Sequence, residues 1–269
     1  MDPNLRSALL GVVQGLTEFL PISSSGHLAI GAQLFGETET TLAFIVLLHV
    51  GTLVATAIVL RTEVGAMLDE LGRCLGRPAR FRETDEGREL AAVMIGTAIT
   101  AVLALALQPV AESFTQNLLG VGVGLLVTAG VLLTTRRADG ALTVPTTRIA
   151  LLVGLAQGIA VLPGISRSGS TIAAALLLGM QPAAAFRFSF LLSIPIILLA
   201  VAHEIVFGDE PRAGFSTEAL VGGLMAFAVG FLALVWLRRL VTRGRFWAFS
   251  LYLVPVGIAV ILFSLGDVR

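Results

Sequence analysis

The sequence predicts an all-α integral membrane protein with six transmembrane helices and two re-entrant helical hairpins in an inverted-topology repeat. Three observations predict it: the 269 residues are 56% hydrophobic and only 13% charged, one polar motif occurs in both halves, and arginines gather in alternate loops. So little polar surface is atypical of a soluble globular domain and typical of a chain that faces lipid. We expect a single membrane domain over 1–269, with a first repeat at 1–135 and a second at 148–269.

The polar motif interrupts the apolar sequence at 14–27 and again at 157–170. The first copy reads QGLTEFLPISSSGH and the second QGIAVLPGISRSGS. Each has an apolar run cut by Pro and Gly, a serine-rich turn, and a second short apolar run that ends near Ala32 or Met180. This pattern predicts a re-entrant hairpin, because irregular backbone is tolerated at membrane depth only where it lines a polar cavity.

Six other windows are apolar enough to cross a bilayer, which takes about 20 residues per helix. In chain order they are 42–60, 90–107, 118–135, 185–206, 219–237 and 247–265. The first apolar run is a poor signal peptide, because Gln14 and Glu18 interrupt it, and we expect it to remain in the mature protein.

Charge placement predicts the orientation. All 18 basic residues are arginines, and most lie in loops at 61–88, 136–148 and 238–245, which we expect to be cytoplasmic. Loops near 108–116 and 207–216 should then face outward. The first hairpin would lie on the outer side and the second on the inner side, with their polar turns meeting near the midplane. We interpret 61–88 as a solvated linker on the membrane surface, and the net charge of zero argues against a nucleic-acid partner.

The first copy of the motif carries ionisable groups, which are costly inside a membrane segment and therefore candidates for function. Gln14 and Glu18 are four residues apart, on one face of a helix. His27 can act as acid, base or nucleophile near neutral pH, and it could activate a neighbouring hydroxyl if a helix starts at this turn. The hydroxyls available to it are those of Ser23, Ser24 and Ser25. The structural alternatives are a carboxylate that only braces the turn and serines that only cap a helix.

The second copy carries a fixed cation instead. Arg167 offers a planar fork that matches two phosphate oxygens, at the expected start of a helix whose N–H groups also favour anions. The neighbouring groups expected to contribute are Ser166, Ser168, Gly169 and Thr171. An unpaired arginine would be costly here, so the alternative is a structural ion pair with Glu18. The surrounding donors exceed what one carboxylate needs, which favours phosphate. We place His49, Arg187, His203 and Glu204 outside the site.

The two motifs together resemble those of the undecaprenyl-diphosphate phosphatase family, the bacitracin-resistance type of integral membrane pyrophosphatase. The resemblance rests on Gln14-x-x-x-Glu18, Pro21, the serine turn and His27, and on PGISRSGST at 163–171, and it covers essentially the whole chain. It implies a multi-pass plasma-membrane protein whose active site opens to the outer face. The implied reaction hydrolyses undecaprenyl diphosphate to the monophosphate and inorganic phosphate, recycling the lipid carrier of cell-envelope glycan synthesis, usually with a divalent cation such as Mg²⁺ or Ca²⁺.

The resemblance also implies roles for single residues. Glu18 would hold the metal or orient water, His27 would serve as base or nucleophile, and Ser24 is a candidate nucleophile. Arg167 would bind the diphosphate and is expected to be catalytic, together with Glu18, His27 and Ser24. The expected substrate-binding residues are Gln14, Ser23, Ser25, Ser166, Ser168, Gly169 and Thr171. The family often has Glu where this chain has Gln14, and its pattern admits either, which weakens only the idea of a metal shared by two carboxylates.

Three points stay open at the level of sequence. The attacking group can be Ser24, His27 or water, and our hypothesis is metal-assisted in-line attack with His27 as base. A homodimer is neither indicated nor excluded. The competing function is a polyprenyl-phosphate flippase, because inverted repeats with broken helices are typical of secondary transporters. The pair of Glu18 and His27 favours an enzyme, since a carrier has less need of reactive groups.

Overall fold

The computed structural model describes residues 2–35, 42–115, 117–207 and 216–266, and the regular elements among them are helices, apart from one isolated β-bridge between Leu142 and Met180. In chain order they are α1 (Pro3–Phe19), α2 (Ser24–Phe35), α3 (Leu42–Val59), α4 (Arg61–Gly76), α5 (Arg80–Glu83), α6 (Asp85–Thr115), α7 (Leu118–Thr134), η1 (Thr135–Arg137), α8 (Thr147–Ile159), α9 (Arg167–Leu177), α10 (Pro182–Phe207), α11 (Thr217–Thr242), η2 (Phe246–Phe249) and α12 (Ser250–Gly266). The predicted all-α class is confirmed.

Five helices of the described ranges are long and apolar enough to cross a membrane: Asp85–Phe114, Leu118–Arg137, Pro182–His203, Thr217–Thr242 and Phe246–Gly266. A sixth candidate is the pair Phe44–Val59 and Arg61–Gly76, which is bent by 86°. The bend follows the composition, because α3 is apolar whereas α4 begins with Arg61 and carries acids and arginines. The chain is therefore a multi-pass membrane protein with five or six crossing helices.

The structure corrects one of the two expected outer loops and leaves the other a prediction. The predicted outer loop at 108–116 is helical as far as Thr115, because α6 continues through Pro109. An internal proline removes one backbone hydrogen bond, and the apolar helix runs on past that loss. The predicted outer loop at 207–216 lies outside the described residues except for Phe207 and Ser216.

The segment 61–88, expected as a solvated linker, is folded around a buried carboxylate. Glu70 of α4 is 2% exposed and accepts two hydrogen bonds from Arg80, at 2.9 Å to Oε1 and 2.8 Å to Oε2. Thr84 donates a third at 3.0 Å, and together these bonds, led by those of Arg80, lower the pKa of Glu70. A carboxylate satisfied in this way ties α4 and α5 to the start of α6.

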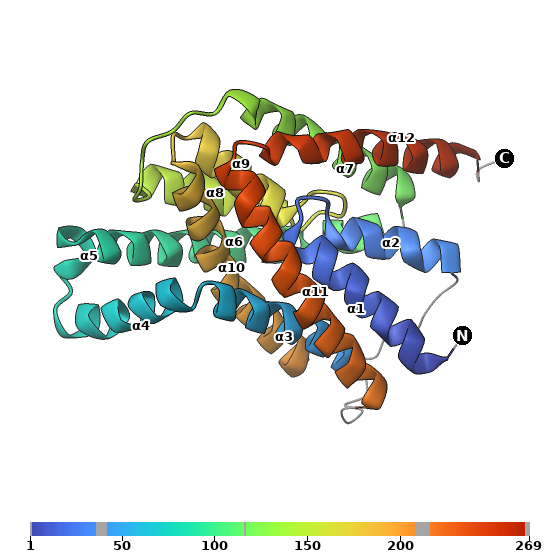
Figure 1. Cartoon of the computed structure of the whole chain (residues 1–269), viewed down its shortest axis with the longest axis horizontal. Helices are drawn as coiled ribbons and strands as arrows, with labels where there is room; N and C mark the ends of the chain where they lie inside the picture. Colours follow the sequence, from blue (N-terminus) through green and yellow to red (C-terminus); the bar gives the residue numbers. More distant parts are fainter. Residues whose placement is uncertain (1, 36–41, 116, 208–215, 267–269) are drawn as a thin grey trace.

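Each hairpin packs against a long helix from the other half of the chain. α1 lies along α11 and α8 lies along α6, and Figure 1 shows the start of α1 and the end of α12 at the side opposite α4 and α5. Glycines allow the close approach: a Cβ on Gly11 would lie 2.3 Å from the carbonyl oxygen of Gly222, and one on Gly154 would lie 2.8 Å from that of Gly96. The assignment of repeats to 1–135 and 148–269 stays a prediction.

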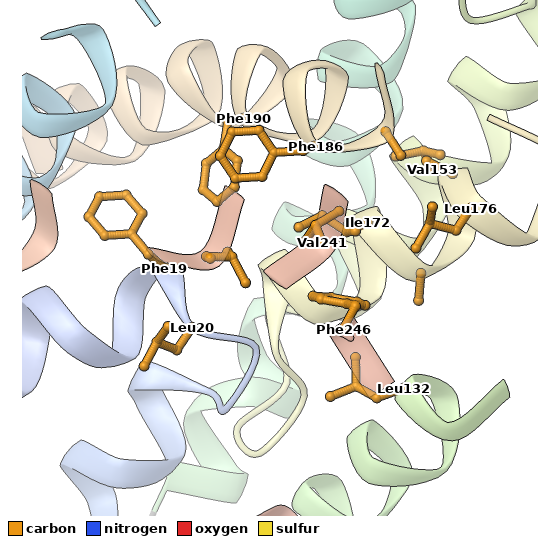
Figure 2. Close-up of a cluster of buried hydrophobic side chains, with 14 of the residues drawn as sticks. Phe19, Leu20, Leu132, Val153, Ile172, Leu176, Phe186, Phe190, Val241 and Phe246 are labelled. Carbon is orange, nitrogen blue, oxygen red and sulfur yellow. The ribbon is translucent and has the colours of Figure 1, made fainter. Parts of the chain in front are cut away.

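A buried apolar cluster connects the two turns. Phe19 and Leu20 precede the first turn, and Figure 2 shows them in one cluster with Ile172 of α9 and with Phe186 and Phe190 of α10. The ring centroids of Phe19 and Phe190 are 5.9 Å apart, and those of Phe186 and Phe190 are 4.7 Å apart. Because such a core is densely packed, the polar residues beside it are held in place.

Candidate active site

The two polar turns meet inside the protein. The guanidinium Nη2 of Arg167 donates to Glu18 Oε1, and the two side chains are 19% and 6% exposed. The backbones also touch, since a Cβ on Gly26 would lie 3.3 Å from Cα of Gly164, and one on Gly169 would lie 3.3 Å from Cβ of Pro21. The prediction that the turns meet is confirmed.

Local backbone geometry builds the first turn. α1 ends at Phe19 and Leu20 is extended (φ −65°, ψ 144°), as the residue before a proline tends to be. Ser23 has φ +71° and is the one non-glycine residue with positive φ in the described part of the chain. This conformation costs about 1–2 kcal/mol, and such strain is typical of functional turns. It lets the Ser23 carbonyl accept from the His27 N–H at 3.2 Å and Ser23 Oγ accept from the Gly26 N–H at 3.3 Å.

Glu18 lies at the centre of the site, with donors from both hairpins. Its Oε2 accepts from Gln14 Nε2 and from Ser24 Oγ, each at 3.1 Å, while its Oε1 accepts from Arg167. Gln14 is 1% exposed, and its own Oε1 is buried without a hydrogen-bond partner among the described residues. Both contacts of the structural alternatives are therefore present, because Glu18 pairs with Arg167 and braces the serine turn.

The second turn is held by its own cap and by α7. Ser166 Oγ accepts from the Gly169 N–H at 3.1 Å and lies 3.3 Å from Ser168 Oγ, so Ser166 caps α9. Thr128 of α7 donates to the Gly164 carbonyl at 2.9 Å and accepts from the Ser166 N–H at 3.1 Å. Sequence reasoning missed Thr128, whose one signal is a hydroxyl within an otherwise apolar window.

Several predicted side chains bond locally. Thr171 Oγ1 donates to the Arg167 carbonyl at 3.0 Å, within its own helix. Ser25 Oγ lies 3.4 Å from Ser23 Oγ.

Arg187, placed outside the site, donates to Glu89 Oε1 at 2.9 Å and to the Thr143 carbonyl at 2.9 Å. It lines a cavity of about 380 Å³ between α4, α6 and α10 that no residue of the two turns lines.

The predicted contact between a serine hydroxyl and the imidazole is not formed. Ser24 donates to Glu18, whereas His27 Nδ1 lies 2.9 Å from the backbone carbonyl of Ser23. His27 Nε2 lies 2.8 Å from the hydroxyl of Tyr252, on α12. The turn, whose Ser23 has positive φ, presents the Ser23 carbonyl to the ring, so the hydroxyl contact that the spacing made possible is not formed in this structure. Tyr252 was also missed, although it is the only tyrosine of the chain.

Residues 7–259 match the model of the family described as bacitracin resistance protein BacA. The chain belongs to this family. An undecaprenyl-diphosphatase of Desulforapulum autotrophicum is 42% identical over 267 residues, with 96% of this chain and 97% of the relative covered. Those of Desulfosudis oleivorans and Korarchaeum cryptofilum are 44% and 41% identical, covering 96% and 95% of this chain and 97% of each relative. The family resemblance inferred from the two motifs is confirmed.

In this member of the BacA family, the meeting of the turns brings two helix N-termini together. α2 begins at Ser24 and α9 begins at Arg167, directly after the turns that touch. The N-terminus of a helix carries a partial positive charge and free N–H groups, so two of them beside a guanidinium favour an anion. Among the described residues, Glu18 supplies the one carboxylate that is bonded to this cation.

The oxygen atoms beside Glu18 are of the kind that a hard divalent cation prefers. No group of three His, Cys, Asp or Glu side chains that could hold a metal ion gathers within the described ranges. Mg²⁺ is commonly bound by one or two carboxylates together with substrate phosphates. Glu18 offers the carboxylate, and the buried, unpartnered Oε1 of Gln14 offers a second hard oxygen ligand.

Proposed function

We propose that this protein hydrolyses undecaprenyl diphosphate to undecaprenyl phosphate and inorganic phosphate. The observation that carries the proposal is the buried contact between Glu18 and Arg167 at the junction of two helix N-termini. The relatives named undecaprenyl-diphosphatase support it, because they match nearly the full length of both chains.

Binding of the diphosphate begins with an exchange of partners at Arg167. Its guanidinium donates to Glu18, and a phosphate can replace this carboxylate because it accepts the same fork of N–H groups. Ser166 and Ser168, whose hydroxyls lie together at the start of α9, add donors. The released Glu18 keeps its hydrogen bonds from Gln14 and Ser24 and so stays in position beside the substrate.

The reaction is an in-line displacement at the terminal phosphorus. A water oxygen forms the new P–O bond, and the bond between this phosphorus and the lipid monophosphate oxygen breaks. His27 is the base that accepts the proton of the water. Ser24 is the alternative nucleophile, since its hydroxyl already donates to a carboxylate. Catalysis of this kind consists mainly of positioning and of charge stabilisation, which the fixed Arg167 supplies.

A divalent cation would be held by Glu18 and Gln14 together with the diphosphate. When bound, it neutralises the charge that develops on the phosphate oxygens. The protein's own groups fix the position of the Glu18 carboxylate. Gln14, one helix turn before Glu18, donates to it at 3.1 Å.

We place the enzyme in the plasma membrane, with its site opening to the outer face. The arginine-rich α4 and α5 lie at the side opposite the start of α1 and the end of α12 (Figure 1), and the positive-inside rule assigns that side to the cytoplasm. A polyprenyl-phosphate flippase is not favoured, because a carrier has no need of a hydroxyl bonded to Glu18 or of an imidazole at the same turn.

The test measures phosphate released from undecaprenyl diphosphate by the purified protein in detergent, with and without added Mg²⁺. We expect release by the wild type, and a loss of at least about 100-fold in His27→Ala and Arg167→Ala. The matched control is Arg187→Ala, which removes an ion-paired arginine outside the site and should retain activity. Wild-type release by either site variant would refute the proposed roles, and absence of release by the wild type across several divalent ions would refute the function.

A further inference from the structure

Both nitrogen atoms of the His27 ring have hydrogen-bond partners. Nδ1 lies 2.9 Å from the Ser23 carbonyl oxygen and Nε2 lies 2.8 Å from the Tyr252 hydroxyl. A carbonyl oxygen can only accept, so Nδ1 carries the ring proton. In the neutral ring Nε2 is then the acceptor, and the Tyr252 hydroxyl donates to it.

This arrangement limits how His27 can act as a base. Nε2 has a single lone pair, and that lone pair is already bonded to the phenol. A water molecule therefore cannot give its proton to Nε2 directly while the bond is intact. The phenol oxygen, however, can accept one hydrogen bond while it donates another. A proton can reach His27 through Tyr252 without any movement of the ring.

Tyr252 is placed by the packing of α12 against α7. Gly257 of α12 approaches Gly122 of α7 so closely that a Cβ on Gly257 would lie 3.2 Å from the Gly122 carbonyl oxygen. α2, which carries His27, contacts α7 as well. The phenol and imidazole rings are nearly parallel, at 15°, with centroids 5.8 Å apart. The hydrogen bond between Tyr252 and His27 thus joins α12 to the first turn, although the two residues are 225 positions apart in the sequence.

Ring packing does not explain the hydroxyl. Tyr252 lies on α12 between Leu251 and apolar residues such as Val254, where phenylalanine would supply the same ring. A hydroxyl in an apolar environment costs free energy unless it is bonded, and here it is bonded to the proposed base. Tyr252 is 45% exposed, so the protein does not fully enclose its side chain.

We propose that Tyr252 is a catalytic residue that relays a proton from the attacking water to His27. The water gives its proton to the phenol oxygen as that oxygen gives its own proton to Nε2. The hydroxide oxygen forms the bond to phosphorus, and the bond between this phosphorus and the lipid monophosphate oxygen breaks. The imidazolium then returns its proton through the same hydroxyl to the phosphate product, which restores both side chains. This inference rests on the proposed hydrolysis.

The first test compares Tyr252→Phe, His27→Ala and the double variant with the wild type in the phosphate-release assay. We expect Tyr252→Phe to lower kcat about 100-fold with little change in KM, the usual size of a proton-transfer contribution. The double variant should be no slower than His27→Ala, because the two residues serve one step. The matched control is Phe263→Leu, on the same helix and 48% exposed, which should leave turnover unchanged.

The second test uses the fact that the chain has a single tyrosine. Growth on a fluorinated tyrosine replaces position 252 alone and makes its phenol more acidic without removing any carbon or oxygen atom that packs. A tyrosinate cannot donate, so the alkaline limb of the kcat profile should move to lower pH by the drop measured for the free amino acid. A structural role of the ring would leave the profile unmoved.

The outcomes separate this proposal from the function on which it rests. Absence of phosphate release by the wild type refutes the hydrolysis itself. An active wild type together with a Tyr252→Phe variant within about twofold of it refutes only the relay. An unmoved alkaline limb in the fluorinated enzyme, or a double variant that multiplies the two losses, refutes the relay equally.

Discussion

Replacing Arg167 by alanine leaves the Glu18 carboxylate buried without its cation. The Glu18 side chain is 6% exposed and would retain two neutral donors, Gln14 and Ser24, each at 3.1 Å. Two neutral hydrogen bonds contribute about 0.5–1.5 kcal/mol each, less than the several kcal/mol of desolvation that a buried charge costs. Breaking a buried pair costs about 3–5 kcal/mol, and we expect the lower end because the Arg167 side chain is 19% exposed and water can enter.

The measurement is the free energy of unfolding from a denaturant titration in detergent micelles, paired with phosphate release from the same preparation. The double variant Glu18→Gln with Arg167→Ala should regain most of the lost stability, because an amide needs no cation. It should remain inactive, because the substrate has lost its guanidinium. Arg187→Ala serves as control, since its partner Glu89 is more exposed, with 18% of the side chain accessible, and lies outside the site. A double variant that regains phosphate release would show that Arg167 is only structural.

Three other perturbations test the packing, the second turn and the cation. Thr128→Val removes a buried hydroxyl that bonds two backbone groups of the second turn. We therefore expect a loss of about 1–3 kcal/mol in the free energy of unfolding, and lower turnover. The control is Thr134→Val, which changes an exposed position and should leave both measurements unchanged. Gly11→Val should cost about 1–3 kcal/mol by overpacking α1 against α11, while Gly130→Ala, which meets no atom within 4 Å, should change the same titration little. Chelation should abolish phosphate release and Mg²⁺ should restore it; turnover that persists in chelator would remove the cation from the proposal.

The meeting of Glu18 and Arg167 could be predicted because both are costly in lipid and each requires the other or an equivalent ligand. The helical class followed from composition for a similar reason, since backbone groups in lipid must be paired within the segment. The contact does not by itself establish catalysis, and the roles of Glu18, Ser24, His27 and Arg167 stay predictions. The cost of charged groups in lipid predicts which side chains come together, but it does not predict the reaction that they carry out.

Thr128 and Tyr252 could not be predicted from the sequence, for a different reason. A threonine in an apolar helix can satisfy its hydroxyl on its own backbone, as Thr134 does with the Val131 carbonyl. Thr128 instead reaches the second turn. The two positions look alike in sequence, because the distinction depends on which helix lies alongside. The role of Tyr252 likewise depends on α12 lying close to α2, and no local sequence pattern predicts that contact.

The two copies of the repeated motif differ in backbone conformation, and this difference explains why the first presents the imidazole and the second presents the cation. Each turn uses one residue with positive φ, but the first places it at Ser23 and the second at Gly164, where φ is +87°. Glycine adopts this conformation without strain, so the second turn is relaxed and presents the N-terminus of α9. Serine adopts it at a cost, and the first turn gains a carbonyl that accepts from both the backbone and the ring of His27. The strain in the first copy therefore fixes the orientation of the imidazole, and the relaxed second copy supplies the cation that the carboxylate of the first requires.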